Sequence, residues 1–130
     1  MKLLTYQCSR FAWAPHSQTL EGADPAVADE VAECLVAFVH VQAEDTEEDR
    51  RKRAFRHALK HLKWLANKRK LRNIVLHSFA HLGGTTADPE FARQLIEDLQ
   101  TRLTDTGYSV STTPFGWFCS WELAVYGDSL

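Results

Sequence analysis

A histidine in a glycine-rich turn is the first residue of this sequence that is suited to a functional site. His81 follows a short apolar segment and precedes Gly83 and Gly84, ahead of a second predicted helix. Strand ends that face a helix N-terminus are where α/β sheets bind ligands, and glycines let backbone N–H groups turn toward a ligand oxygen. We expect His81 to be catalytic, although a histidine that only hydrogen-bonds its own loop fits the local pattern too.

A cysteine in the last apolar segment is the second such residue. Cys119 lies between Trp117 and Trp121 at alternating positions, and most lone cysteines in strands pack as small hydrophobic side chains. Close to His81, its thiol would instead form a thiolate–imidazole pair able to act as a nucleophile. The three cysteines are an odd number without close spacing, which indicates reduced thiols. We predict neither a metal ion nor an organic cofactor.

Apolar runs of two kinds predict the elements that position these residues. Short β-rich runs bounded by turn residues indicate strands at residues 3–11, 34–41, 73–79, 108–112 and 117–125. Apolar residues at helical spacing predict two helices, one capped by Thr46 and closed by residues 68–70, the other opened by Asp88–Pro89 and ended by Gly107. The proline- and glycine-containing stretch 14–30 is expected to be a long irregular loop.

The size and composition of the chain are those of one globular domain. It has 130 residues, of which 45% are hydrophobic and 25% charged. We predict a single α/β domain over residues 1–130, with two helices packed on a mixed sheet of about five strands in the order β-β-α-β-α-β-β. The N-terminus does not resemble a signal peptide, and no segment reaches the roughly 18 apolar residues of a membrane span. A cytoplasmic location without membrane contact is expected.

The first predicted helix concentrates positive charge in a chain whose formal net charge is −2. From Glu47 to Arg72 there are eleven lysine or arginine residues and three acids, and no acid follows Asp49. Such a stripe attracts phosphate, although the solvated side of an amphipathic helix gives the same pattern. Trp64 offers a ring for stacking. The residues expected to contact an RNA backbone are Arg50, Arg53, Lys60, Lys68, Arg69 and Lys70.

Four short motifs occur in the order found in one known family. They are the strand Leu35–Phe38, Phe79–Leu82 after an apolar run, Asp88–Pro89 at a helix start, and Pro114–Gly116 before an aromatic pair. Together they resemble the archaeal-type N-terminal editing domain of threonyl-tRNA synthetase over nearly the whole chain. The resemblance implies the fold of D-aminoacyl-tRNA deacylases, a homodimer, and hydrolysis of serine mischarged on threonine tRNA. Because threonine and serine differ by one methyl group, a pocket separates them weakly and a second hydrolytic site is needed.

The resemblance also implies a site that binds the 3′ aminoacyl end of tRNA. His81 holds the position of the family's histidine, and water attacks the ester beside the terminal ribose. Phe79 and Ala80 would line the pocket for the adenosine and the amino acid. Val41 and Ala92 fall at other pocket-lining positions, and the main chain near Ala80 would orient the substrate.

The sequence departs from the family after Pro-Phe-Gly. Trp117, Phe118 and Cys119 stand where the family has two tyrosines and a lysine that assists catalysis. We expect Trp117 and Phe118 to line the substrate pocket and Cys119 to occupy the site. Losing the lysine removes a positive charge from the developing oxyanion, which typically costs a few kcal/mol. The family's glutamate, expected beyond Leu130, has no counterpart here.

These residues leave three functions open. The first is a free-standing editing domain that hydrolyses an aminoacyl-tRNA ester in trans, for a threonyl-tRNA synthetase lacking its own editing module. The second is a non-catalytic relative that binds tRNA or a synthetase, which the missing lysine and glutamate favour. The third is an enzyme that uses Cys119 for thiol or metal chemistry.

Overall fold

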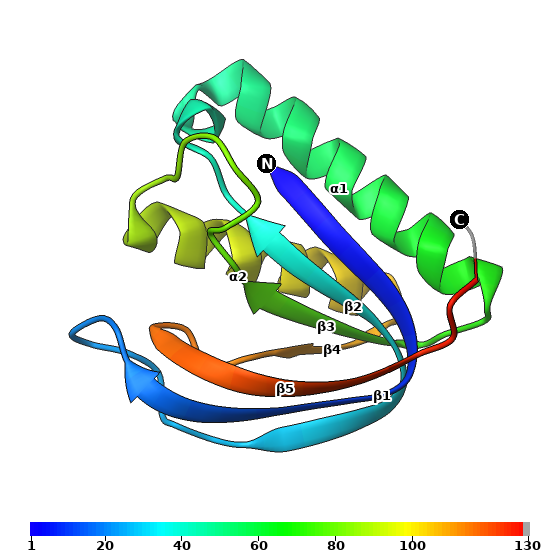
Figure 1. The fold of residues 1–130 in the computed structure, drawn as a ribbon. Coiled ribbons are helices and arrows are strands. Elements are labelled where there is room, and N and C mark those ends of the chain that lie inside the picture. Colours follow the sequence, from blue (N-terminus) through cyan, green and yellow to red (C-terminus); the bar gives the residue numbers. More distant parts are fainter. Residues whose placement is uncertain (129–130) are drawn as a thin grey trace.

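The computed structural model describes residues 1–128 as one curved sheet and two long helices (Figure 1). The elements are β1 (Lys2–Gln18), β2 (Asp29–His40), the 3-10 helix η1 (Ala43–Thr46), α1 (Glu48–Lys68), β3 (Asn73–Ser78), α2 (Pro89–Asp105), β4 (Ser109–Thr112) and β5 (Trp117–Val125). The predicted α/β class, with two helices on a mixed five-stranded sheet in the order β-β-α-β-α-β-β, is confirmed.

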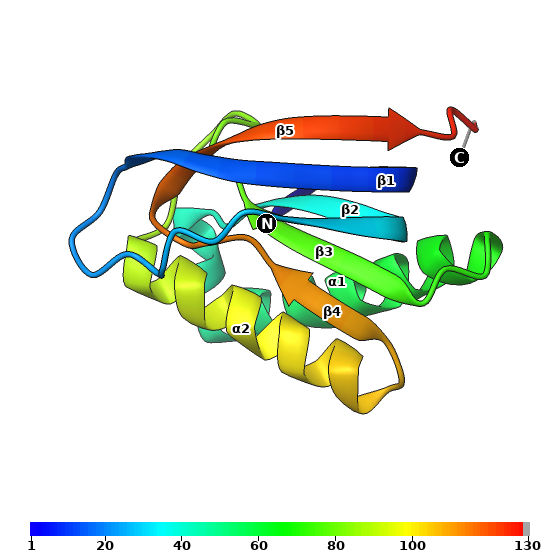
Figure 2. The same cartoon turned by 90° about the horizontal axis from the view of Figure 1, so that it is seen from below.

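The sheet has the strand order β4-β3-β2-β1-β5, which Figure 2 shows from below. The pairs β1–β2 and β1–β5 are antiparallel, whereas β2–β3 and β3–β4 are parallel. The crossovers between the parallel strands contain α1 and α2. As a result, the carboxyl ends of β2, β3 and β4 lie at one edge of the sheet, where α/β folds bind their ligands.

The strand β2 is buried on both faces of the sheet. Leu35 and Val39 pack with the helices in the larger core, while Val36 and Phe38 pack on the opposite face with Phe11 of β1. A strand that contributes to two cores must be apolar at successive positions, which explains the uninterrupted apolar run in the sequence.

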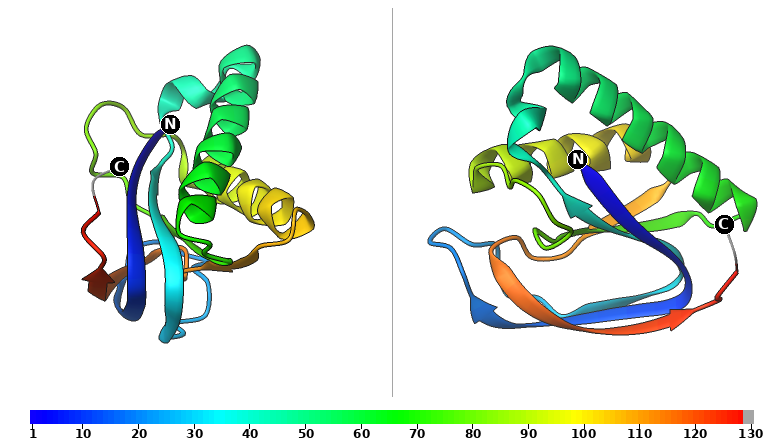
Figure 3. Two further views of the ribbon diagram at one scale, coloured as in Figure 1. Left: turned by 90° about the vertical axis from the view of Figure 1, so that its right-hand side faces the viewer. Right: turned by 45° about the horizontal axis from the view of Figure 1, so that its top comes forward.

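Both helices cover the same face of the sheet (Figure 3). The helix α1 has 21 residues and ends at Lys68, within the predicted closing segment 68–70. The helix α2 begins with Pro89 and is followed by Gly107 at φ +103°, as expected. The predicted cap at Thr46 is wrong. Thr46 lies in η1, where its hydroxyl donates to the Ala43 carbonyl at 2.7 Å, and Glu47 precedes the first turn of α1. None of the helices in residues 1–128 is long and apolar enough to cross a membrane.

The expected irregular loop over 14–30 is largely strand, and only residues 19–28 lie outside β1 and β2. Pro15 is accommodated because it pairs with Cys119 beside a register shift in the β1–β5 ladder, the position in which a sheet tolerates proline. A second shift follows Cys8. Such irregularities increase bending and twist, and β1 passes from β2 to β5 with a pronounced curve (Figure 1).

Candidate functional site

A cavity of about 480 Å³ lies at the carboxyl ends of β2 and β3 and at the start of α2. Its remaining walls come from the turn before β5, the first half of β5 and the end of β1. A volume in this range is typical of small-ligand sites. The residues that the sequence predicted for catalysis and substrate binding all line this cavity: Val41, Phe79, Ala80, His81, Ala92, Trp117, Phe118 and Cys119. Segments from four parts of the chain therefore meet around one space.

His81 stands at the mouth of the cavity with an exposed side chain. Its ring meets the ring of Phe79 edge to face, with centroids 5.2 Å apart and an interplanar angle of 76°. This contact restricts the imidazole from one side and leaves its nitrogens free of protein partners among residues 1–128. His81 is thus placed to hydrogen-bond a ligand or a water molecule.

An aromatic cluster closes the inner end of the cavity. Trp121 of β5 lies 4.9 Å from Phe38, 5.4 Å from His77 and 5.6 Å from Phe79, measured between ring centroids. The side chain of Trp121 is 37% exposed and lines the cavity. The cluster provides flat apolar surfaces of the kind on which nucleobases stack.

His77 is the buried polar member of this cluster. Its Nδ1 lies 2.7 Å from the Thr113 hydroxyl, and the side chain is almost fully enclosed. Burial lowers the pKa of His77 from 6.5 to about 4, so its imidazole is neutral at pH 7.

His40, at the end of β2, was missed by the sequence analysis. Its Nδ1 accepts a hydrogen bond from the Leu82 backbone N–H at 3.2 Å, and its Nε2 lies 3.0 Å from the Thr86 hydroxyl. Since Nδ1 accepts, the neutral ring carries its proton on Nε2 and donates to Thr86. One buried imidazole therefore spans the loop that follows His81. The only sequence signal was a histidine inside an otherwise apolar strand.

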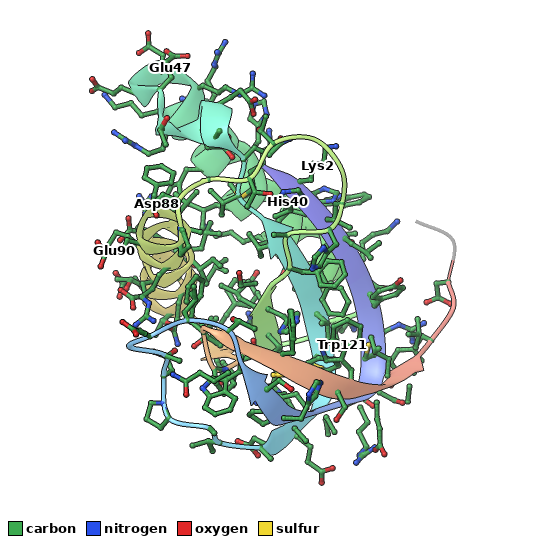
Figure 4. All side chains as sticks on the ribbon, turned by 60° about the vertical axis from the view of Figure 1, so that its left-hand side comes forward. Lys2, His40, Glu47, Asp88, Glu90 and Trp121 are labelled. Carbon is green, nitrogen blue, oxygen red and sulfur yellow. The ribbon has the colours of Figure 1, made fainter. Side chains whose placement is uncertain are left out.

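Lys2 fastens the same loop from the outside. Its Nζ donates to the carbonyl oxygens of Leu82 at 3.2 Å and Gly83 at 2.9 Å. Figure 4 shows Lys2 and His40 beside this loop, with Trp121 on β5 below them. Gly83 and Gly84 have positive φ, and a Cβ on Gly84 would lie 3.0 Å from the Gln42 amide nitrogen. The glycines thus permit both the backbone conformation of the loop and the close approach of the Lys2 and Gln42 side chains.

Asp24 holds the Pro-Phe-Gly turn in place, a role that no local sequence pattern indicates. Its carboxylate accepts a hydrogen bond from the Phe115 N–H at 2.9 Å and pairs with Arg93 of α2 at 3.2 Å. Its carbonyl accepts a bond from the Trp117 indole N–H at 2.8 Å. The connection 19–28 therefore joins α2 to the turn that begins β5.

Cys119 is half-buried, and burial raises the pKa of its thiol above the ordinary value. A raised pKa disfavours the thiolate that a nucleophile or a metal ligand requires. Cys119 lies opposite Pro15 in the β1–β5 ladder and lines the cavity together with His81. Among residues 1–128, no group of three or more histidine, cysteine or acidic side chains is arranged to hold a metal ion.

The lining of the cavity contains no fixed charge within the described part of the chain. Its titratable members are His16, His77, His81 and Cys119, and no lysine, arginine, aspartate or glutamate lines it. Such a site suits a ligand that binds through stacking and hydrogen bonds.

The six basic residues predicted to contact RNA lie on or just after α1 and differ in their surroundings. Arg50 and Arg53 line a second surface groove, and Lys68 lies 4.5 Å above the Trp64 ring. Arg69 packs 3.8 Å from the Tyr126 ring and pairs with Asp128, so its charge is compensated within the chain. Lys60 and Lys70 are exposed.

Fold and site together define an α/β domain with an uncharged, aromatic-walled ligand cavity at the ends of its parallel strands. The chain belongs to the archaea-specific editing domain family of threonyl-tRNA synthetase, whose model matches residues 1–130. Membership associates the chain with aminoacyl-tRNA editing in protein biosynthesis, as the sequence resemblance predicted.

Individual relatives are threonine–tRNA ligases of archaea. The chain is 34% identical over 100 residues to that of Methanosphaera stadtmanae, covering 77% of this chain and 16% of the ligase. It is 33% identical over 98 residues to that of Methanocaldococcus jannaschii, with 75% and 16% covered. With the ligase of Methanopyrus kandleri it shares 31% over 132 residues, covering 100% and 21%. The chain thus spans about a fifth or less of the length of these relatives.

Proposed function

We propose that this domain hydrolyses the ester bond of mischarged aminoacyl-tRNA, with serine on threonine tRNA as the first substrate expected. The observation that carries the proposal is the convergence of His81, the Phe79–Ala80 segment and the start of β5 on one cavity. Family membership supports the editing function, and the volume of about 480 Å³ suits the end of a nucleic acid that carries an amino acid.

In this proposal the terminal adenosine stacks against the aromatic cluster and the amino acid lies toward Val41 and Ala92. The exposed imidazole of His81 orients a water molecule or the ribose hydroxyl beside the ester carbon. Backbone N–H groups of the loop after β3 stabilise the oxyanion, since the described cavity lining has no cationic side chain. Cys119 lines the pocket as a neutral thiol.

A non-catalytic domain that binds tRNA or a synthetase is the second candidate function. The uncharged cavity lining and the cysteine at the family's lysine position favour it. Binding of tRNA without turnover, unchanged in His81→Ala, is the result that would support this alternative.

The direct test is a deacylation assay on the chain with seryl- and threonyl-tRNA, comparing wild type with His81→Ala and Cys119→Lys. We expect hydrolysis of the seryl ester, a loss of about 100-fold or more in His81→Ala, and a gain in Cys119→Lys, which supplies a cation for the oxyanion. No turnover of any aminoacyl ester by wild type or Cys119→Lys, with tRNA binding intact, overturns the proposal.

Three further properties complete the proposal. The first is a homodimer, which the edge of β5 left unpaired among residues 1–128 and its exposed Val125 support; sedimentation equilibrium tests it. The second is action in trans for a threonyl-tRNA synthetase lacking an editing module, in the cytoplasm, where tRNA is charged. The third is contact of the basic residues of α1 with the tRNA backbone.

A further inference from the structure

One face of α1 carries a row of cationic and aromatic side chains that the cavity does not use. The row follows helical spacing of three and four residues, so its members lie on one side of the helix. All six are exposed. We call them the α1 strip: Arg50, Arg53, His57, His61, Trp64 and Lys68.

The first part of the strip borders a groove of about 490 Å³ between α1 and the beginning of β1. Met1 and Leu3 form its other side. Asp45 lines the groove too, but its carboxylate is fully buried; it pairs with the Met1 amine at 2.7 Å and lies 4.0 Å from the Arg50 Nε, so it presents no exposed negative charge. Arg50 and Arg53 therefore line a groove in which an anion meets cations and little opposing charge.

The second part of the strip centres on an exposed tryptophan. Trp64 is 51% exposed, although its ring could bury a large apolar area in a core. Instead, the Trp64 ring contacts two exposed side chains of the same helix. His61 is stacked at a centroid distance of 6.2 Å and an interplanar angle of 23°, and the Lys68 Nζ lies 4.5 Å from the ring centroid.

We propose that the α1 strip binds an RNA strand, with phosphates in the groove at Arg50 and Arg53 and an unpaired base stacked on Trp64. This inference rests on the proposed function for the identity of the RNA as tRNA, but it names a site separate from the cavity. The charge and the ring of the strip indicate which ligand it binds. Three permanently charged side chains (Arg50, Arg53 and Lys68) and one flat ring lie along one helix face, although the whole chain has a net charge of −2. Proteins bind single-stranded nucleic acid with this combination.

The position of the groove agrees with a strand that continues from the cavity. Met1 and Leu3 of the groove flank Lys2, whose Nζ fastens the loop that follows His81. The groove and the cavity therefore lie on either side of one strand end and its loop. A nucleic acid whose 3′ end enters the cavity would pass this point with its preceding phosphates.

The test measures the affinity of the full chain for an uncharged tRNA transcript over a series of salt concentrations. We expect Arg50→Gln/Arg53→Gln to weaken binding about tenfold and to lower the salt slope by one to two, since each phosphate contributes roughly 0.7 to 0.9. Trp64→Leu should weaken binding at least fivefold while Trp64→Phe restores most of it, because stacking needs a ring.

Arg56→Gln/Lys63→Gln is the matched control, since it removes two positive charges from α1 outside the strip. We expect it to change the affinity less than twofold. Equal losses of tRNA affinity in the two double variants would show that only net charge matters. A wild-type affinity in Trp64→Leu would show that no base stacks on Trp64. Either result overturns the proposal.

Deacylation kinetics separate this inference from the proposed function. Strip variants should raise KM and leave kcat within about twofold, whereas His81→Ala should lower kcat with unchanged tRNA affinity. If no ester is hydrolysed, the tRNA affinities of the variants still show whether the α1 strip binds RNA. If hydrolysis proceeds with an unchanged KM in the strip variants, the strip inference fails and the cavity assignment stands.

Discussion

The Nδ1 of His40 accepts a hydrogen bond from the backbone N–H of Leu82 at 3.2 Å. This bond joins the end of the central strand to the residue directly after His81. Because Nε2 of the same ring reaches Thr86 at 3.0 Å, both ends of the intervening loop are tied to β2. The position of His81 in the cavity therefore depends on a side chain that does not line it.

Substitutions of His40 should separate these two bonds. An Asn side chain reaches the position of Nδ1 and a Gln side chain that of Nε2, so His40→Asn should preserve the bond to Leu82 and His40→Gln the bond to Thr86. We expect His40→Leu to lose about 1–3 kcal/mol of stability in urea denaturation, because the Leu82 N–H is left unsatisfied.

In deacylation assays, kcat/KM should fall most in His40→Leu and least in His40→Asn. Thr86→Val serves as the complementary variant. Activity equal to that of wild type in all three His40 variants would show that the loop does not need this anchor.

His77 should make the stability of the domain depend on pH. Its folded pKa of about 4 lies below the ordinary 6.5, so between these values the unfolded chain binds a proton that the folded chain does not. Stability should therefore be full above about pH 6.5 and fall as the pH drops to about 4, by roughly 3 kcal/mol for this residue.

His77→Asn can keep the hydrogen bond that Nδ1 makes to Thr113, and it removes the titrating ring. Its urea unfolding free energy should fall less than that of wild type between pH 6.5 and pH 4, and the difference between the two curves isolates the histidine from the carboxylates. Parallel curves would contradict the burial-driven shift.

Gly116, in the Pro-Phe-Gly turn, should tolerate no side chain. Its φ is +89°, and an added Cβ would lie 2.7 Å from the Ala23 Cβ. Gly107 has a similar φ of +103° but open space around it. Gly107→Ala should cost about 1 kcal/mol for the left-handed backbone alone, and Gly116→Ala at least 1 kcal/mol more for the overlap. Thermal unfolding of both variants measures the difference.

The cysteines should differ sharply in their reaction with iodoacetamide at neutral pH. Burial raises the pKa of Cys8 to about 11 and that of Cys34 to about 12, and both side chains are inaccessible. Cys119 should be labelled first, but more slowly than a free thiol, and bound tRNA should slow it further. Peptide mass spectrometry identifies the site, and rapid labelling of Cys119 would revive thiol chemistry in the cavity.

Much of the fold was predictable because local patterns and tertiary packing agree in the second half of the chain. The helix α2, with Pro89 at its start and Gly107 after its end, and the strand β5 lie where the sequence predicted them. The first strands were predicted too short. Three of the exposed residues at the start of β2 are acidic (Asp29, Glu30 and Glu33), and Pro15 lies next to a register shift, so hydrophobic periodicity does not reveal the pairing that extends these strands.

The site was predictable where residues resemble family motifs and not where contacts cross the chain. His81 and Phe79 stand in a recognisable segment. Asp24 gives no local signal, because its role arises only when residues 19–28 fold against Phe115 and Arg93. The anchoring by His40 likewise depends on a loop 42 residues away in sequence.

The strand β5 supplies Trp117, Phe118, Cys119 and Trp121 to the cavity wall, yet within residues 1–128 it lies at the edge of the sheet and pairs only with β1. Among the elements of this domain, β1 leaves the ribosome first and β5 last. The β1 edge that receives β5 must wait until all the other helices and strands of this domain have been synthesised. The pocket is therefore completed late in folding, because β1 and β5 are far apart in the sequence. Substitutions that slow the pairing of β1 with β5 should give molecules in which the core under the helices forms before the pocket does.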